Sequence, residues 1–179
     1  TSVAVNRKST VPVTAPSSTG GSVITVYTAT ASAGDITGII SKAGSGSITV
    51  SGLTNGTAYT VTVTATNSIG TSFASAAANP VTTNTIPDAP TIGTAVAGNQ
   101  QATVPFTAPS SNGGSAITIY TATSSPGGRT GTLSQSGSGS ITVTGLTNET
   151  AYTFTVTATN AIGTSVGSNV SNSVLRGPQ

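Results

Sequence analysis

Eight side chains of the 179-residue chain carry a formal charge, five of them basic and three acidic. The acidic residues are Asp35, Asp88 and Glu149, and the basic residues are Arg7, Lys8, Lys42, Arg129 and Arg176. The chain contains no His and no Cys. General acid-base catalysis and metal binding need clustered titratable or ligating groups, whereas these residues are scattered along the sequence. The composition therefore predicts a protein that is not an enzyme and that has no cofactor and no metal site.

The charge and the apolar runs of the sequence argue against nucleic-acid binding and against a membrane span. The net charge is +2, and no cluster of Lys and Arg underlies the sequence pI of about 9.3. Nucleic-acid binding needs a row of contacts to phosphates, which this sequence does not supply. No apolar run approaches the roughly 20 residues of a membrane-spanning helix. We therefore expect neither nucleic-acid binding nor a membrane span.

The sequence repeats itself with a constant offset of 93 residues. VPVTAPSSTGGSVITVYTAT from Val11 recurs as VPFTAPSSNGGSAITIYTAT from Val104 (104 − 11 = 93), and the segment from Ser45 recurs from Ser138 (138 − 45 = 93). A constant offset across both blocks indicates two folding units of the size of a β-sandwich domain. Pro87 bounds the junction between them, because proline removes a ladder donor and stiffens the backbone. We predict domains at 1–86 and 87–179.

Both repeats contain a stretch with strict alternation of apolar and threonine side chains. The apolar positions are Tyr59, Val61, Val63 and Ala65 in the first repeat, and Tyr152, Phe154, Val156 and Ala158 in the second. A period of two places all apolar side chains of a strand on one face. Thr and Val are strong strand formers, and no 3.6-residue period typical of a helix is present. The pattern predicts an all-β protein.

The same residues resemble a known family. GLTNETAYTFTVTATNAIGTS and its twin from Gly52 are similar to the region around strands E and F of fibronectin type III domains, and PDAPTI from Pro87 resembles the first strand of such a domain. The similarity is greatest to tandem fibronectin type III domains of large bacterial surface and secreted proteins. It implies two tandem immunoglobulin-like β-sandwiches. The family's usual Trp on strand B is absent, and Val13 and Phe106 stand near its place, which implies smaller cores.

The resemblance also assigns structural roles to four residues. Tyr59 and Tyr152 would be tyrosine-corner residues, whose hydroxyls bond to the backbone a few residues upstream. Leu53 and Leu146 would close one end of each sandwich. None of these roles is catalytic.

Two functions are compatible with this sequence. The first is a structural module of an extracellular or cell-surface protein, acting as a spacer or as the subunit of a filament or surface assembly. Its partners would be other domains of the parent protein or identical subunits. Few charged residues guard the strand edges, so we expect edges or faces to be covered by neighbouring domains, subunits or sugar.

The alternative is an adhesin or a carbohydrate-binding accessory module of a secreted protein. Against it, sugar sites usually expose aromatic rings, and most aromatics here occupy predicted core positions: Tyr27, Tyr59, Tyr120, Tyr152, Phe73, Phe106 and Phe154. A second kind of contact with glycan is covalent attachment. The sequence patterns at Asn55, Asn148 and Asn169 match N-glycosylation acceptors. The threonine face of the alternating strand is the other place where sugar could attach.

The two repeats differ at their beginnings. A shift of 93 residues pairs Thr1 with Thr94, so the first repeat has no equivalent of Pro87–Ile92 and its first strand is short or missing. Either the given sequence begins within the domain, or another segment completes the sheet by strand addition.

Overall fold

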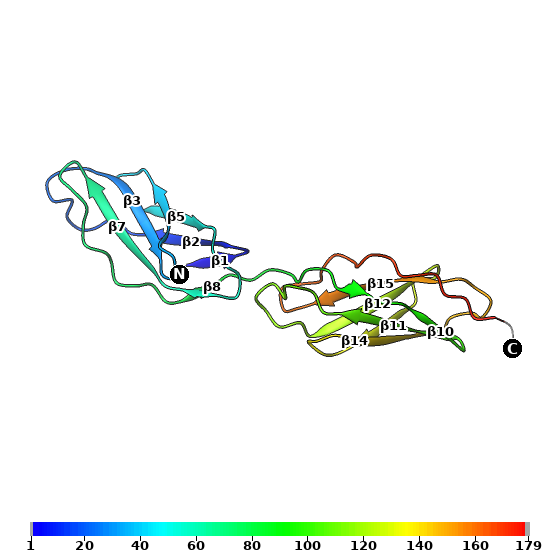
Figure 1. The fold of residues 1–179 in the computed structure, drawn as a ribbon. Helices are drawn as coiled ribbons and strands as arrows, with labels where there is room; N and C mark the ends of the chain where they lie inside the picture. The colour runs from blue at the N-terminus through cyan, green and yellow to red at the C-terminus, as the bar shows by residue number, and fades with distance from the viewer. Residues whose placement is uncertain (1, 178–179) are drawn as a thin grey trace. The chain divides into compact units, whose positions relative to one another are not determined.

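The computed structural model describes residues 2–177, which contain strands and loops but no helix. They form two compact units, one ending at Asn84 and the other beginning at Thr85 (Figure 1). This division lies two residues before the predicted boundary of 86/87. The reason is that the Thr85 N–H donates to the Gly113 carbonyl at 2.8 Å, so the whole TIPDAPTI segment is bonded into the second unit.

The first unit contains eight strands in two three-stranded sheets and one short pair. The strands are β1 (Val3–Val5), β2 (Lys8–Val13), β3 (Ile24–Ala31), β4 (Ile36–Ile40), β5 (Gly46–Ser51), β6 (Ala58–Tyr59), β7 (Val61–Asn67) and β8 (Val81–Thr82). One sheet has the order β1-β2-β5 and the other β4-β3-β7, while β6 pairs with β8. All pairings are antiparallel.

The second unit repeats the two main sheets, has one additional strand, and has an isolated bridge between Tyr152 and Val174 in place of the β6–β8 pair. Its strands are β9 (Thr91–Ile92), β10 (Val96–Gly98), β11 (Gln101–Thr107), β12 (Ile119–Ser125), β13 (Thr130–Leu133), β14 (Gly139–Thr144) and β15 (Thr153–Thr159). The sheets have the orders β10-β11-β14 and β13-β12-β15. The additional strand, β9, pairs with the end of β11. Among the described residues the first unit has no counterpart of β9.

The register of the sheets is the same in both units. Val11 pairs with Ile48 in the first unit, and Val104 pairs with Ile141 in the second, each pair 93 residues apart from the other. Because side chains alternate across a strand, an identical register places the equivalent side chains on the core face in both copies. The two units are therefore two copies of one sandwich.

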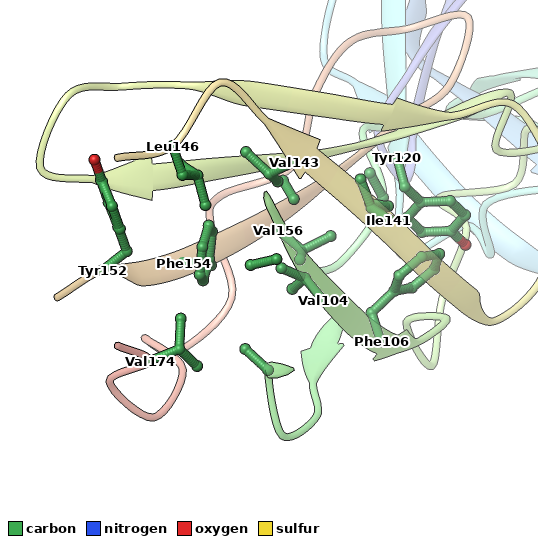
Figure 2. Packing of buried hydrophobic residues seen from close by; sticks show 14 of the residues in the cluster. Val104, Phe106, Tyr120, Ile141, Val143, Leu146, Tyr152, Phe154, Val156 and Val174 are labelled. Carbon is green, nitrogen blue, oxygen red and sulfur yellow. The ribbon is translucent and has the colours of Figure 1, made fainter. Parts of the chain in front are cut away.

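Each unit has its own hydrophobic core between its two sheets. In the second unit the core includes Val104, Val143, Phe154 and Val156, all at most 1% exposed (Figure 2). Phe106 and Tyr120 lie with their ring centroids 4.3 Å apart. The first core has valine, at Val13 and Val61, where the second has Phe106 and Phe154. Since stabilisation grows with the apolar area buried, the first core is the weaker one.

Phe73 is a correction to the predicted core positions. Its side chain is fully exposed, and its counterpart Val166 is 72% exposed. Both follow the long strand of their unit in a segment that does not alternate with a period of two. Because this segment does not alternate, the aromatic ring of Phe73 is not buried as expected.

Candidate functional site

The two predicted corner tyrosines occupy equivalent places. The Tyr59 hydroxyl accepts a hydrogen bond from the Thr54 N–H at 3.0 Å, and the Tyr152 hydroxyl accepts one from the Thr147 N–H at 3.2 Å. Both tyrosines are buried residues at one end of their core. These hydroxyls act on the chain's own backbone, in a turn that leads into the longest alternating strand.

The predicted closing leucines lie beside these corners. Leu53 and Leu146 are 0% and 6% exposed. Figure 2 shows Leu146 and Tyr152 at the same end of the second core. The N–H of each leucine donates to the first hairpin turn of its unit, Leu53 to the Arg7 carbonyl between β1 and β2 and Leu146 to the Gln100 carbonyl between β10 and β11. The end of each sandwich is therefore closed by side-chain packing and by the backbone together.

The tyrosines differ in the direction of their pKa shifts, and this predicts an ordered alkaline titration. Hydrogen bonding from the Thr54 backbone lowers the pKa of Tyr59, and the Thr147 backbone does the same for the pKa of Tyr152. Burial raises the pKa of Tyr120. In a titration followed by phenolate absorbance, Tyr59 and Tyr152 should ionise before Tyr120. Single Tyr→Phe variants assign each step.

The same shifts predict how stability depends on pH in the alkaline range. A pKa raised in the folded state gives a contribution that is present below the unfolded value of about 10 and is lost as the pH rises through the folded value. Ionisation of Tyr120 should therefore lower the stability of the second unit at high pH. Tyr120→Phe should remove this step. An unchanged alkaline unfolding midpoint in that variant would contradict the assignment.

An asparagine clamps the first hairpin of each unit. The Asn55 Oδ1 accepts from the Arg7 N–H at 2.9 Å, and its Nδ2 donates to the Asn6 Oδ1 at 3.0 Å. Asn148 makes the equivalent bonds to Gln100 and Asn99. The Nδ2 atom that N-glycosylation would modify is thus already engaged at both positions. This clamp was not predicted, although the 93-residue spacing of Asn6 and Asn99 was a usable signal.

A serine recurs at every third position in the last segment of the second unit. The N–H groups of Ser165, Ser168 and Ser171 donate to the carbonyls of Ala158, Val156 and Phe154 at 2.8–2.9 Å. The hydroxyls of the same serines accept from the N–H groups of the same three β15 residues at 2.9–3.0 Å. Each step of three residues along this segment therefore covers the same length as a step of two residues along β15. This explains why the segment does not alternate and why Val166 faces solvent.

The first unit keeps this serine pairing at two of the three positions. Ser72 and Ser75 pair with Ala65 and Val63 in the same way, whereas Ala78 stands in the place of Ser171. The Ala78 N–H still donates to the Val61 carbonyl at 2.8 Å, but alanine has no hydroxyl to accept from the Val61 N–H.

Two separate variants, with alanine at position 171 and serine at position 78, should shift stability in opposite directions. Ser171→Ala is expected to destabilise the second unit by about 0.5–1.5 kcal/mol, the typical net value of one hydrogen bond. Ala78→Ser should stabilise the first unit by up to about the same amount. Calorimetry of each variant measures both. A loss of stability in Ala78→Ser would show that the serine pairing does not extend to this position.

The first unit has an open apolar groove beside the end of β2. Its volume is about 690 Å³, and its floor includes Val13, Tyr27, Val63 and Ala65. The exposed side chain of Phe73 lies at its rim. Val63 and Ala65 are half-buried, while their counterparts Val156 and Ala158 are completely buried in the second unit. The groove is therefore a difference between the two copies.

Other polar groups of the described chain give little scope for chemistry. Among residues 2–177 there is no group of three or more His, Cys, Asp or Glu side chains that could hold a metal ion. None of the described segments forms a helix long and apolar enough to cross a membrane. The polar side chains that the structure brings together, at the corners, clamps and serine pairs, bond mainly to backbone of their own unit.

Comparison with known proteins identifies the domain family of the second unit. The model of the fibronectin type III domain family matches residues 88–174, so the second unit is a fibronectin type III domain. The first unit repeats its register and strand order, and the chain as a whole consists of two tandem immunoglobulin-like β-sandwiches. None of the curated proteins compared with the chain matches it.

The chain is also similar to solved structures. The chain is similar to the crystal structure of chicken CNTN1 FN1-FN3 domains, with 19% identity and a TM-score of 0.54 over 94% of this chain and 62% of that one. Titin kinase and its flanking domains match with 28% identity and a TM-score of 0.42, over 51% of this chain and 17% of that one. The twitchin kinase region from C. elegans matches with 24% identity and a TM-score of 0.44, over 52% and 17%. The chain thus spans less than two thirds of each of these structures, and the first supports the fold alone.

Domains of this family are common structural modules of multidomain proteins and are generally not catalytic.

Proposed function

We propose that the chain is a non-enzymatic structural module of a bacterial surface or secreted protein, which spaces neighbouring domains or assembles with them outside the cell. The observation that carries this proposal is the junction between the units. The Asn84 carbonyl accepts from the Asn6 N–H in the first unit, and the next residue, Thr85, is bonded to Gly113 in the second. No residue lies between them that belongs to neither unit. Both boundary residues are bonded within their own unit, so no long flexible linker stands there, and such a linker would not suit a spacer because it lets domains move independently.

Spin-label distance measurements test the spacer role. Thr49 and Thr142 are exposed and equivalent positions on β5 and β14, and the chain has no native Cys that would compete for the label. With both replaced by Cys and labelled, a spacer should give one narrow distance distribution. Inserting Gly-Ser-Gly-Ser between Asn84 and Thr85 should broaden it. A distribution that is already broad without the insertion would contradict a spacing function.

The adhesin alternative has one observation in its favour, the fully exposed ring of Phe73 at the rim of the groove. Aromatic rings at the surface are typical sugar platforms. A glycan array with the Phe73→Ala variant as control distinguishes the two functions. Specific binding that is lost in the variant would favour the adhesin, and the absence of binding supports the structural module.

A further inference from the structure

Each unit contains one Asn-Gly dipeptide, and the two lie at different places of the repeat. The first is Asn55-Gly56, and Asn148-Glu149 stands in its place in the second unit. The other is Asn112-Gly113, and Thr19-Gly20 stands in its place in the first unit. A glycine leaves its own nitrogen open to attack the side-chain amide of a preceding asparagine, because it has no Cβ. The chain therefore carries two dipeptides of the same chemistry in two different surroundings.

The side chain of Asn112 is folded forward over the backbone that follows it. Asn112 is exposed, and its Oδ1 accepts a hydrogen bond from the Gly114 N–H at 2.9 Å. This bond closes a ring that contains both the side-chain carbonyl carbon Cγ and the Gly113 nitrogen. A donor at Oδ1 also stabilises the negative charge that this oxygen acquires when a nucleophile adds to Cγ. The hydrogen bond thus keeps the two reacting atoms in one turn and favours their reaction.

The other groups that this reaction needs are turned toward solvent. The Gly113 N–H donates to the Ser111 hydroxyl at 3.1 Å, and Ser111 is exposed although Gly113 itself is buried. The leaving group would be the Nδ2 atom of Asn112, and no residue of the described chain accepts a hydrogen bond from it. Ammonia can therefore leave Asn112 without breaking a bond to the protein.

Asn55 has more restrictive surroundings. The Arg7 N–H and the Asn6 Oδ1 hold both ends of its side-chain amide, at 2.9 and 3.0 Å. The Gly56 N–H donates at 2.8 Å to the carbonyl of Thr83, which is a buried residue. Attack of the Gly56 nitrogen on Asn55 therefore requires that these bonds break first.

We propose that Asn112 is a site of spontaneous deamidation and that the clamp of Asn55 protects that residue from the same reaction. The Gly113 nitrogen bonds to the Asn112 Cγ and loses its proton, while the Cγ–Nδ2 bond breaks and ammonia leaves. Water, the only co-reactant, then opens the resulting five-membered imide at either of its carbonyls. Opening at Cγ gives aspartate. Opening at the main-chain carbonyl gives isoaspartate, whose backbone runs through Cβ and Cγ and is one atom longer.

Isoaspartate at position 112 acts on the segment that begins at Thr85. The Gly113 carbonyl accepts from the Thr85 N–H at 2.8 Å, and the Asn112 carbonyl accepts from the Nδ2 of the buried Asn160 at 2.9 Å. A Cβ atom on Gly113 would collide with the carbonyl oxygens of Thr85 and Ile86, so this place has no room for a longer backbone. The additional backbone atom therefore displaces Gly113 and breaks its bond to Thr85.

Mass spectrometry of the full chain, aged in mildly alkaline buffer, tests the proposal. Chymotrypsin separates the two dipeptides, because Tyr59 and Phe106 lie between them, and deamidation appears as the gain in mass when NH is replaced by oxygen. Asn112 should deamidate at least about tenfold faster than Asn55, since several hydrogen bonds must break before Asn55 can react. Equal rates in the folded chain would overturn the proposal.

Three controls show whether the difference comes from the fold. In urea, where the clamp is lost, the two dipeptides should deamidate at similar rates, and a difference that persists there would overturn the proposal. Asn6→Ala removes the acceptor of the Asn55 Nδ2 and should accelerate deamidation at Asn55 alone. An unchanged rate in this variant would contradict the protection by the clamp. Asn112→Thr, which introduces the residue of the first unit, should abolish the signal of the second dipeptide.

Hydrogen exchange followed by NMR tests the effect on the segment. In the isoaspartate product the Thr85 N–H should exchange faster than in the fresh chain. Asn112→Asp is the matched control, because it introduces the charge of the product and keeps an acceptor for the Gly114 N–H without lengthening the backbone. Its Thr85 N–H should stay protected. Equal protection of Thr85 in the fresh chain and in the isoaspartate product would contradict the displacement of the segment.

Discussion

Replacing Phe154 with alanine is expected to destabilise the second unit by about 3–5 kcal/mol. Phe154 is 1% exposed and lies on β15 between the corner at Tyr152 and the centre of the core (Figure 2). Removing a buried phenyl ring loses its transfer free energy and leaves a cavity that the neighbours fill only in part. Small domains have total stabilities of about 5–15 kcal/mol, so the variant should lose much of its margin.

Calorimetry measures this effect, with Val61→Ala as the matched control. Val61 occupies the position of Phe154 in the first unit and is 2% exposed. It loses only two methyl groups on truncation, which corresponds to about 1–2 kcal/mol. Each substitution should lower the transition of its own unit. A smaller loss in Phe154→Ala than in Val61→Ala would contradict the account of the two cores.

Replacing Asn160 with alanine is expected to cost the second unit at least about 2 kcal/mol, because each buried backbone group left without a partner costs about 1–3 kcal/mol. The Asn160 side chain holds the Thr85 and Asn112 carbonyls through Nδ2. Its Oδ1 accepts from the N–H groups of Ile162 and Gly163 at 2.9 and 3.1 Å. The substitution should therefore also release the segment that begins at Thr85.

The equivalent change in the first unit provides the control. Asn67 makes the same two turn bonds, to Ile69 and Gly70, but it lies at the open groove and is half-buried. Water can reach the groups that Asn67→Ala leaves, so its cost should be about 1 kcal/mol or less. Urea unfolding followed by NMR separates the two units. Equal losses in both variants would show that the segment from Thr85 does not cover Asn160 in solution.

The fold could be predicted because its main signals are local. Alternation of apolar and threonine residues predicts the long strand of each repeat, and β7 and β15 confirm the all-β class. The constant offset of 93 residues predicts two copies of one sandwich, and the shared register confirms it. Both patterns depend only on side-chain direction along a strand, which a sequence states directly.

The last segment of each unit could not be predicted in the same way. The role of Ser168 depends on its distance from the Val156 backbone, and a serine in a polar stretch gives no sign of such a partner. Phe73 was expected in the core because aromatic rings usually are buried, but the three-residue spacing of the serines turns it outward. The bond from Thr85 to Gly113, two residues before the predicted boundary at 86/87, likewise joins residues far apart in the sequence.

The groove of the first unit could be predicted from the sequence only in part. The absence of a counterpart to Pro87–Ile92 was visible in the sequence and predicts a short or missing first strand in the first repeat. The sequence alone could not show that Asn67 would bond to the Ser22 carbonyl at 3.3 Å, or that Gly20 and Gly70 would have so few close neighbours. These facts depend on the positions of atoms far apart in the sequence.

Amide hydrogen exchange, measured for both units in one sample, tests the central claim most directly. If one sandwich is completed by its own leading segment and the other is left open, the N–H groups of Ser165 and Ser168 should exchange much more slowly than those of Ser72 and Ser75. The Thr85 N–H should be protected along with the second unit. Equal protection of the two serine pairs, or exchange at Thr85 as fast as in an unfolded chain, would contradict the claim.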